Sequence, residues 1–207
     1  MSEDFTHRFL RGSGDVKFTL LLLHGTGGNE NDLIPLGNTL APGAPLLSPR
    51  GKTLENGMPR WFRRIADGVF DMQDLVARSR ELAQFVGEAA KRYGFDAQCI
   101  VPVGYSNGAN IAAAMMLLGL LKPPAAVLFR AMVPLVPEAP PQLSDTRIFI
   151  GAGSNDPLVS PAETAKLVAL FEAAGANVQT HFTENGHHID SEEVETAAGW
   201  LQQIFKQ

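Results

Sequence analysis

The sequence has one cysteine, no excess of positive charge and no long apolar run. Cys99 is the only cysteine among 207 residues, so no internal disulfide can form and an oxidising compartment is not required. Cys99 lies in an apolar run, where we expect a buried small hydrophobe and not a nucleophile. The net charge of −5 argues against a nucleic-acid-binding surface.

Membrane and export signals are also lacking. The longest apolar run, Ile111 to Leu121, is about half as long as a membrane span. The first fifteen residues are polar and contain no apolar signal core. We therefore expect a cytoplasmic protein without membrane insertion.

Strand-like and helix-like runs alternate along the chain, which is typical of parallel βα units. Several strand candidates are apolar throughout, as strands covered on both faces tend to be. We expect one α/β domain over residues 1–207, with a mostly parallel twisted central sheet and helices on both faces. The expected strands are Val16–His24, Ala44–Leu47, Gln98–Val103, Ala125–Ala131, Arg147–Gly151 and Val178–Phe182. The expected helices are Glu30–Leu40, Met72–Tyr93, Asn107–Leu121, Pro161–Ala174 and Ser191–Phe205.

One segment, Ser48 to Gly68, breaks this alternation and has no clear period. Loops of that length in compact domains tend to be functional or disordered, and its aromatic and arginine side chains argue against disorder. Three arginines of this segment, Arg60, Arg63 and Arg64, are close together in sequence. Asp67 and Asp71 follow them, which predicts a local ion-pair network.

Ser106 stands between two glycines where a buried strand meets a buried helix. The residues Gly104 to Gly108 are GYSNG, which fits G-x-S-x-G in the strand–helix context of a nucleophile elbow. The turn is so sharp that side chains two positions either side of the serine would collide with neighbouring backbone. The helix N-terminus and the N–H of Asn107 favour negative charge nearby. We predict that Ser106 is a nucleophile; the alternative is a strand–helix turn with a capping serine.

A glycine-rich loop follows an earlier apolar strand. The residues His24 to Gly28, HGTGG, come directly after four leucines. A hydrolase with a nucleophile elbow binds the oxyanion with two backbone N–H groups, and the second comes from the loop after this strand. Thr26 is the candidate for this second donor, beside Asn107. Neither phosphate-binding glycine pattern is present. We expect His24 to form structural hydrogen bonds and not to act as the base.

Asp156 is the candidate acid. It follows the expected strand Arg147–Gly151, and catalytic groups of open α/β sheets lie at the carboxyl ends of strands. An Asx turn or a helix cap is the alternative. The rival carboxylates Asp145 and Glu138 precede the strand and therefore lie at its wrong end.

Two adjacent histidines follow the last expected strand. We choose His187 as the base over His188, because His187 directly follows Gly186. The chain order Ser106, Asp156, His187 is then the order expected of α/β hydrolases. The two histidines also suggest a metal cluster, but no second ligand group lies near them in sequence, so we expect no metal.

Eight segments together resemble the phospholipase/carboxylesterase family of α/β hydrolases. They are LLLHGTGGNENDL, LSPRG, PRWFRR, DGVFDMQDL, GYSNGANIA, FRAMVPL, AGSNDPLV and NGHHI. They are most similar to the small branch without a cap domain, related to acyl-protein thioesterases and dienelactone hydrolases. The resemblance implies an α/β-hydrolase fold with no separate cap domain, and a homodimer. It also implies a nucleophile, acid and base at Ser106, Asp156 and His187, with oxyanion donors at Thr26 and Asn107.

The expected function is hydrolysis of small-molecule carboxylic esters through an acyl-enzyme intermediate, without a cofactor. The alternatives are a thioesterase or lysophospholipase acting on longer acyl chains, and a catalytically silent binding protein of the same fold. Asn107 departs from acyl-protein thioesterases, which usually have Gln at this position.

The substrate-binding side of the site rests on fewer signals. Trp61 and Phe62 are candidates for the wall of an acyl or aromatic pocket, and ordinary packing of their loop is the alternative. Arg130 ends an expected strand and Met132 follows it, so both are candidates to border the site, and Gly25 is a further candidate contact. Arg50 or Arg130 would attract an anionic substrate, unless each simply pairs with an acidic residue.

Overall fold

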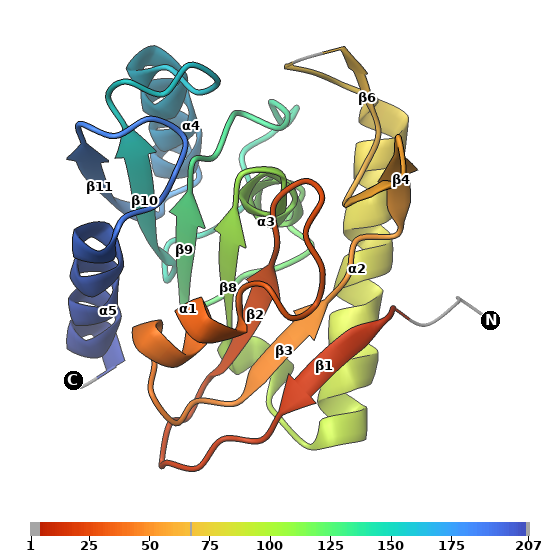
Figure 1. The fold of residues 1–207 in the computed structure, drawn as a ribbon, viewed down its shortest axis with the longest axis vertical. Coiled ribbons are helices and arrows are strands. Elements are labelled where there is room, and N and C mark those ends of the chain that lie inside the picture. The colour runs from red at the N-terminus through yellow and green to blue at the C-terminus, as the bar shows by residue number, and fades with distance from the viewer. Residues whose placement is uncertain (1–4, 67, 206–207) are drawn as a thin grey trace.

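The computed structural model describes residues 5–66 and 68–205, and a seven-stranded sheet lies at its centre (Figure 1). The strand order is β1-β3-β2-β8-β9-β10-β11. Strand β1 is antiparallel to β3, and all other neighbours are parallel. The strands are β1 (His7–Leu10), β2 (Thr19–Leu23), β3 (Leu46–Pro49), β8 (Ile100–Tyr105), β9 (Ala125–Phe129), β10 (Arg147–Gly153) and β11 (Asn177–Thr183).

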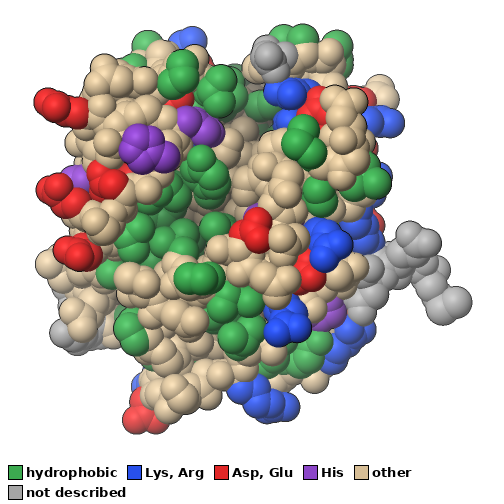
Figure 2. Space-filling view, viewed as in Figure 1, with side chains coloured by type: hydrophobic (Ala, Val, Ile, Leu, Met, Phe, Trp, Pro, Cys, Tyr) green, Lys and Arg blue, Asp and Glu red, His purple; other side chains and the backbone are tan. Residues whose placement is uncertain are grey.

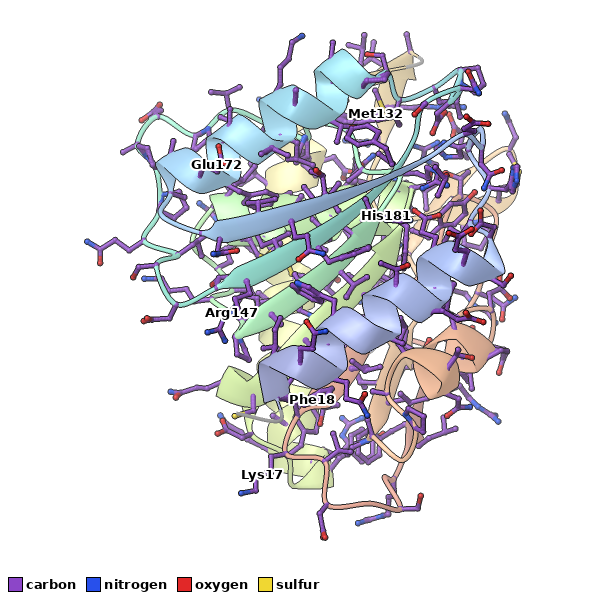
Figure 3. All side chains as sticks on the ribbon, turned by 90° about the vertical axis from the view of Figure 1, so that its left-hand side faces the viewer. Lys17, Phe18, Met132, Arg147, Glu172 and His181 are labelled. Carbon is purple, nitrogen blue, oxygen red and sulfur yellow. The ribbon has the colours of Figure 1, made fainter. Side chains whose placement is uncertain are left out.

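Helices cover both faces of the sheet. Successive leucines of β2 point to opposite faces, because side chains alternate along a strand. Leu20 and Leu22 pack with α1 (Ile34–Leu40) and α5 (Ser191–Phe205). Leu21 and Leu23 belong to the opposite core, with α2 (Met72–Tyr93), α3 (Asn107–Leu117) and α4 (Pro161–Ala173). Figure 3 shows α4 and α5 on opposite sides of the sheet edge formed by β11. The mostly parallel α/β fold is therefore confirmed.

Helix α2 has the predicted bounds and is capped at both ends. In α2, the side chain of Asp71 accepts a hydrogen bond from the N–H of Asp74 at 3.0 Å, and Gly94 ends the helix in the left-handed region at φ 77°. Three predicted helices are too long, and α4 is so by one residue, since it ends at Ala173. Helix α1 begins at Ile34, since residues 29–32 form a hydrogen-bonded turn, and α3 ends at Leu117, just before the left-handed Gly119.

The segment Ser48–Gly68 is not one irregular loop as predicted. It contains the end of β3 and the small hairpin of β4 (Thr53–Glu55) with β5 (Met58–Arg60). It also contains β6 (Arg64–Ala66), which pairs with β7 (Val69–Phe70) directly after the segment. Strands of two or three residues carry no readable period, which explains the error. Strand β1, with four residues, is also short, and it was not predicted.

The arginine cluster forms ion pairs as predicted, though partly with other acids. Arg63 pairs with Asp71 at 3.1 Å, while Arg60 and Arg64 each lie 2.8 Å from a carboxylate oxygen of Glu55. The predicted participant Asp67 lies outside the described residues.

The expected burial of Cys99 is wrong. This residue ends the short 3₁₀ helix Ala97–Cys99 before β8 and is only partly buried. Its thiol lies 3.5 Å from a carboxylate oxygen of Asp96.

None of the described helices is both long enough and apolar enough to cross a membrane.

Candidate active site

Ser106 lies at a sharp turn between β8 and α3, with φ 53° and ψ −116°. A non-glycine residue in this region stores about 1–3 kcal/mol of backbone strain. A Cβ atom added at Gly104 would lie 2.5 Å from Cα of Ala109, and one at Gly108 would lie 1.9 Å from the carbonyl oxygen of Leu23. Both contacts are with backbone, so only glycine fits on either side of the serine.

The structure brings Ser106, His187 and Asp156 together although they lie far apart in sequence. Nε2 of His187 is 2.8 Å from Oγ of Ser106, and Nδ1 is 2.7 Å from Oδ2 of Asp156. This arrangement suits a serine O–H that donates to Nε2 and an Nδ1–H that donates to the carboxylate. It is the geometry required for nucleophilic attack assisted by a general base.

Asp156 is held in place by the backbone that follows it. Its second oxygen, Oδ1, accepts hydrogen bonds from the N–H groups of Leu158 at 2.8 Å and Val159 at 3.1 Å. The carboxylate has no exposed surface. One oxygen is therefore fixed by the loop, and the other is aimed at His187.

Arg130 anchors the loop that carries the histidine. It is buried, takes a left-handed backbone conformation at φ 57°, and forms an ion pair with Glu193 through contacts of 2.5 and 2.9 Å. Its guanidinium also donates to the carbonyl oxygens of Gly186 at 3.0 Å and His188 at 2.6 Å. The residues on both sides of His187 are therefore fastened to one rigid planar group.

The expected attraction of substrate by arginines does not agree with this burial. Arg130 has no exposed side-chain surface, so no substrate reaches it. Arg50 forms a two-point ion pair with Glu30, at 2.5 and 2.8 Å. For both arginines, pairing with an acidic residue is the arrangement found.

Thr26 and Asn107, the predicted oxyanion donors, follow β2 and begin α3 respectively. The N–H of Thr26 has no hydrogen-bond partner within the described part of the chain. Asn107 is the first residue of its helix, so its N–H has no partner inside that helix. The β4–β5 hairpin braces the glycine loop, since the N–H of Gly27 donates to the carbonyl of Pro59 at 2.9 Å.

His24 forms structural hydrogen bonds, as expected. It is 2 % exposed; Nδ1 lies 2.7 Å from the carbonyl oxygen of Gly25, and Nε2 accepts from the N–H of Gly51 at 3.0 Å. Burial lowers the pKa of His24, because the charged imidazolium would lose its hydration. A neutral ring with the proton on Nδ1 satisfies both contacts.

Trp61 and Phe62 do not line an open pocket. They are 2 % and 0 % exposed, and Nε1 of Trp61 donates to the carbonyl oxygen of His24 at 2.8 Å. The N–H of Trp61 donates to the side-chain oxygen of Asn107 at 2.8 Å, which ties this segment to the turn at Ser106. The packing alternative therefore describes both side chains, and the pocket interpretation is corrected.

The other two candidates lie at the carboxyl edge of the sheet. Met132 is half-buried, and its N–H donates to the side-chain oxygen of Asn110 at 2.8 Å. Figure 3 shows it at the end of the molecule opposite Arg147, which begins β10. Gly25 packs so closely on Tyr105 that a Cβ atom would lie 2.9 Å from the ring.

Tyr105 is a site residue that the sequence analysis did not assign. Its hydroxyl donates to the carbonyl oxygen of His187 at 3.1 Å, and the two ring centroids are 5.6 Å apart. Burial raises the pKa of Tyr105, so the hydroxyl remains a donor at neutral pH. Its place directly before Ser106 in the motif was the available signal.

No group of three or more metal-ligating side chains is found within residues 5–66 and 68–205.

Known proteins resemble this chain in sequence and in fold. The model of the family described as Phospholipase/Carboxylesterase matches residues 9–205. The protein MhqD of Bacillus subtilis (strain 168), named as a hydrolase, is 43% identical over 201 residues, which cover 96% of this chain and 98% of the relative.

Two solved carboxylesterases are similar in both sequence and structure. The Bacillus cereus carboxylesterase is 48% identical with a TM-score of 0.92, covering 96% of this chain and 93% of its own. The carboxylesterase of Mesorhizobium loti is 34% identical with a TM-score of 0.86, covering 94% of this chain and 92% of its own.

Proposed function

The chain belongs to the phospholipase/carboxylesterase family of α/β hydrolases, and we propose that it hydrolyses carboxylic esters through Ser106, His187 and Asp156. It is a hydrolase of the carboxylesterase type. The observation that carries the proposal is the unbroken line of contacts from Asp156 to Ser106, 2.7 Å and then 2.8 Å long.

In the first half of the reaction, Oγ of Ser106 attacks the ester carbonyl carbon while His187 accepts the serine proton on Nε2. Asp156 keeps His187 in the required tautomer and stabilises the imidazolium that forms. When the tetrahedral intermediate collapses, its bond to the alcohol oxygen breaks. His187 gives the proton to that oxygen, the alcohol leaves, and the acyl group stays on Ser106.

The second half repeats these steps with water. His187 takes a proton from water, the resulting hydroxide attacks the acyl-enzyme, and the carboxylic acid leaves as Ser106 recovers its proton. The N–H groups of Thr26 and Asn107 hold the oxyanion in both halves, each contributing about 3 kcal/mol. These steps balance without a metal or an organic cofactor.

The cellular setting is part of the same proposal. A single cysteine and a negative net charge suit a cytoplasmic enzyme that acts on small-molecule esters. The homodimer implied by the family resemblance is checked by sedimentation of the purified chain.

The test is a series of p-nitrophenyl esters from acetate to dodecanoate, with the wild type and Ser106→Ala side by side. We expect kcat/KM of the variant to fall at least about a thousandfold. Ser144→Ala is the matched control, because Ser144 is an exposed serine before β10, at the other end of the strand from Asp156. Equal, slow rates for wild type and Ser106→Ala on every ester would favour the silent binding protein. An optimum at the long acyl chains would favour the lipid-directed alternatives.

A further inference from the structure

A groove of about 570 Å³ is lined by residues of α1 and of the start of α5, and by Tyr105. Its volume falls within the range of small-molecule sites. Figure 2 shows hydrophobic side chains gathered on this face, over the gap between the two helices. The apolar lining residues are Leu33, Pro35, Leu36, Tyr105, Ile189 and Val194.

Tyr105 lies between the groove and the catalytic centre and borders both. It lines the groove, directly precedes Ser106, and touches the loop of the base through its bond to the carbonyl of His187. On its other side, the Tyr105 ring packs against Gly25, next to the proposed oxyanion donor. His188, the neighbour of His187, also lines the groove. A molecule bound in the groove therefore contacts a ring whose centroid is 5.6 Å from that of His187.

The charges of the groove select against anions. Asp190 and Glu195 are among its lining residues, and none of the described residues that line it is lysine or arginine. The N–H of Glu193 donates to Asp190 and lowers the pKa of that carboxyl group, so it stays ionised at neutral pH. The apolar side chains that make up most of the rest of the lining fit an uncharged alkyl or aryl surface.

The chemistry of the base indicates which part of an ester lies here. His187 must pass a proton from Nε2 to the alcohol oxygen as the bond between that oxygen and the carbonyl carbon breaks. The alcohol oxygen therefore lies next to His187, and the rest of the alcohol extends away on the side of the histidine loop. His188 and Ile189 of this loop line the groove.

We propose that this groove binds the alcohol part of the substrate, an uncharged alkyl or aryl group. The inference rests on the proposed function and extends it from the reaction to the substrate class. Each methylene buried in the groove is expected to raise kcat/KM about fourfold until the groove is full.

The experiment separates the two ends of the ester. One series holds the acyl group as acetate and varies the alcohol from methanol through butanol to hexanol. The other holds p-nitrophenol as the alcohol and lengthens the acyl group from acetate to octanoate. Leu36→Trp and Val194→Trp each fill the groove from one of its two helices. Leu170→Trp on α4 is the matched control, because Leu170 is half-buried on the opposite face of the sheet.

We expect either groove variant to lower kcat/KM for hexyl acetate at least about tenfold relative to methyl acetate, which corresponds to the loss of two buried methylenes. The dependence on acyl length should stay as in the wild type, and Leu170→Trp should change neither series. In the wild type, the acetate ester of 6-hydroxyhexanoate should react more slowly than hexyl acetate, since it carries a carboxylate into an acidic groove.

The inference is overturned if Leu36→Trp and Val194→Trp change the dependence of kcat/KM on acyl length instead of alcohol length. It is also overturned if they change neither dependence. Methyl acetate serves as the internal check on folding, because its turnover needs the catalytic residues and not the groove. If methyl acetate hydrolysis persists in Ser106→Ala, the proposed function fails. If hydrolysis depends on Ser106 but is unchanged in Leu36→Trp and Val194→Trp, only the present inference fails.

Discussion

Arg130 and Glu193 form an ion pair with no exposed side-chain surface, directly beneath the loop that carries His187. Two guanidinium N–H groups bind the carboxylate, and others reach the carbonyls of Gly186 and His188. Glu193 in turn occupies space that a side chain at Gly151 would fill, since a Cβ atom there would lie 2.2 Å from Oε1. The pair connects the end of β9, the base loop and α5.

This arrangement predicts a separation of activity from stability. Arg130→Met leaves a buried, unpaired carboxylate and should lower the free energy of unfolding by about 3–5 kcal/mol. Arg130→Met combined with Glu193→Leu removes both charges and should recover most of that loss. The base loop stays unanchored in the double variant, so we expect kcat to fall at least about tenfold while KM changes little.

The measurements are denaturant unfolding and steady-state kinetics on p-nitrophenyl acetate. Arg78→Met with Glu81→Leu, a pair on α2 away from the loop, is the control. A double variant that folds and keeps the wild-type kcat would show that Arg130 acts on stability alone.

We predict opposite effects on the free energy of unfolding for substitution of a glycine at the Ser106 turn and of a glycine in α2. Gly108→Ala places a methyl group against the carbonyl of Leu23 and should cost about 3 kcal/mol or more of unfolding free energy. Gly87 lies within α2, and a Cβ atom added there would meet no atom within 4 Å outside the backbone of its own helix. Gly87→Ala should therefore raise the free energy of unfolding by about 0.5–1 kcal/mol. Thermal and denaturant unfolding of both variants measure the difference. Similar values for the two would contradict the tight packing around the turn.

His24 predicts how stability depends on pH. Its pKa in the folded state is lowered from 6.5 by burial, so the unfolded chain binds a proton near that pH that the folded chain does not. Stability therefore falls as the pH drops below about 6.5, by at most about 1.4 kcal/mol per pH unit from this group. Unfolding free energies of the wild type and His24→Gln between pH 5 and 8 are compared. The variant should show the shallower slope, and an unchanged slope would count against a buried neutral His24.

Asp156 predicts a large kinetic effect. Asp156→Asn keeps the shape of the side chain but no longer stabilises the tautomer and the imidazolium of His187. We expect kcat to fall about ten-thousandfold, as loss of the carboxylate does in serine hydrolases generally. Asp145→Asn, an exposed substitution before β10, should leave kcat unchanged. An Asp156→Asn enzyme within tenfold of the wild type would remove Asp156 from the mechanism.

Much of the fold was predictable because local signals agreed with the tertiary structure. Helix α2 has a capping Asp71 and a terminal Gly94, and its bounds were predicted to the residue. The glycines around Ser106 mark the turn because backbone packing leaves no other choice. The meeting of Ser106, Asp156 and His187 followed from their positions at the carboxyl ends of parallel strands.

The remainder depends on contacts that sequence spacing does not encode. Arg130 looked like a substrate-binding charge, because nothing near it in sequence indicates a partner 63 residues later. Trp61 and Phe62 looked like pocket walls, because burial of a loop aromatic is decided by the segments that fold over it. The groove between α1 and α5 was not predicted, since its two sides are distant in the chain.

The central claim is that Ser106 carries the acyl group. The most direct measurement is to mix the wild type with p-nitrophenyl acetate, quench in acid during the first turnover, and map the acetylated peptide by mass spectrometry. We predict acetylation at Ser106 that decays as acetate is released, and none in Ser106→Ala. Turnover by the wild type with no acetyl group on Ser106, or equal turnover by the variant, would contradict the account.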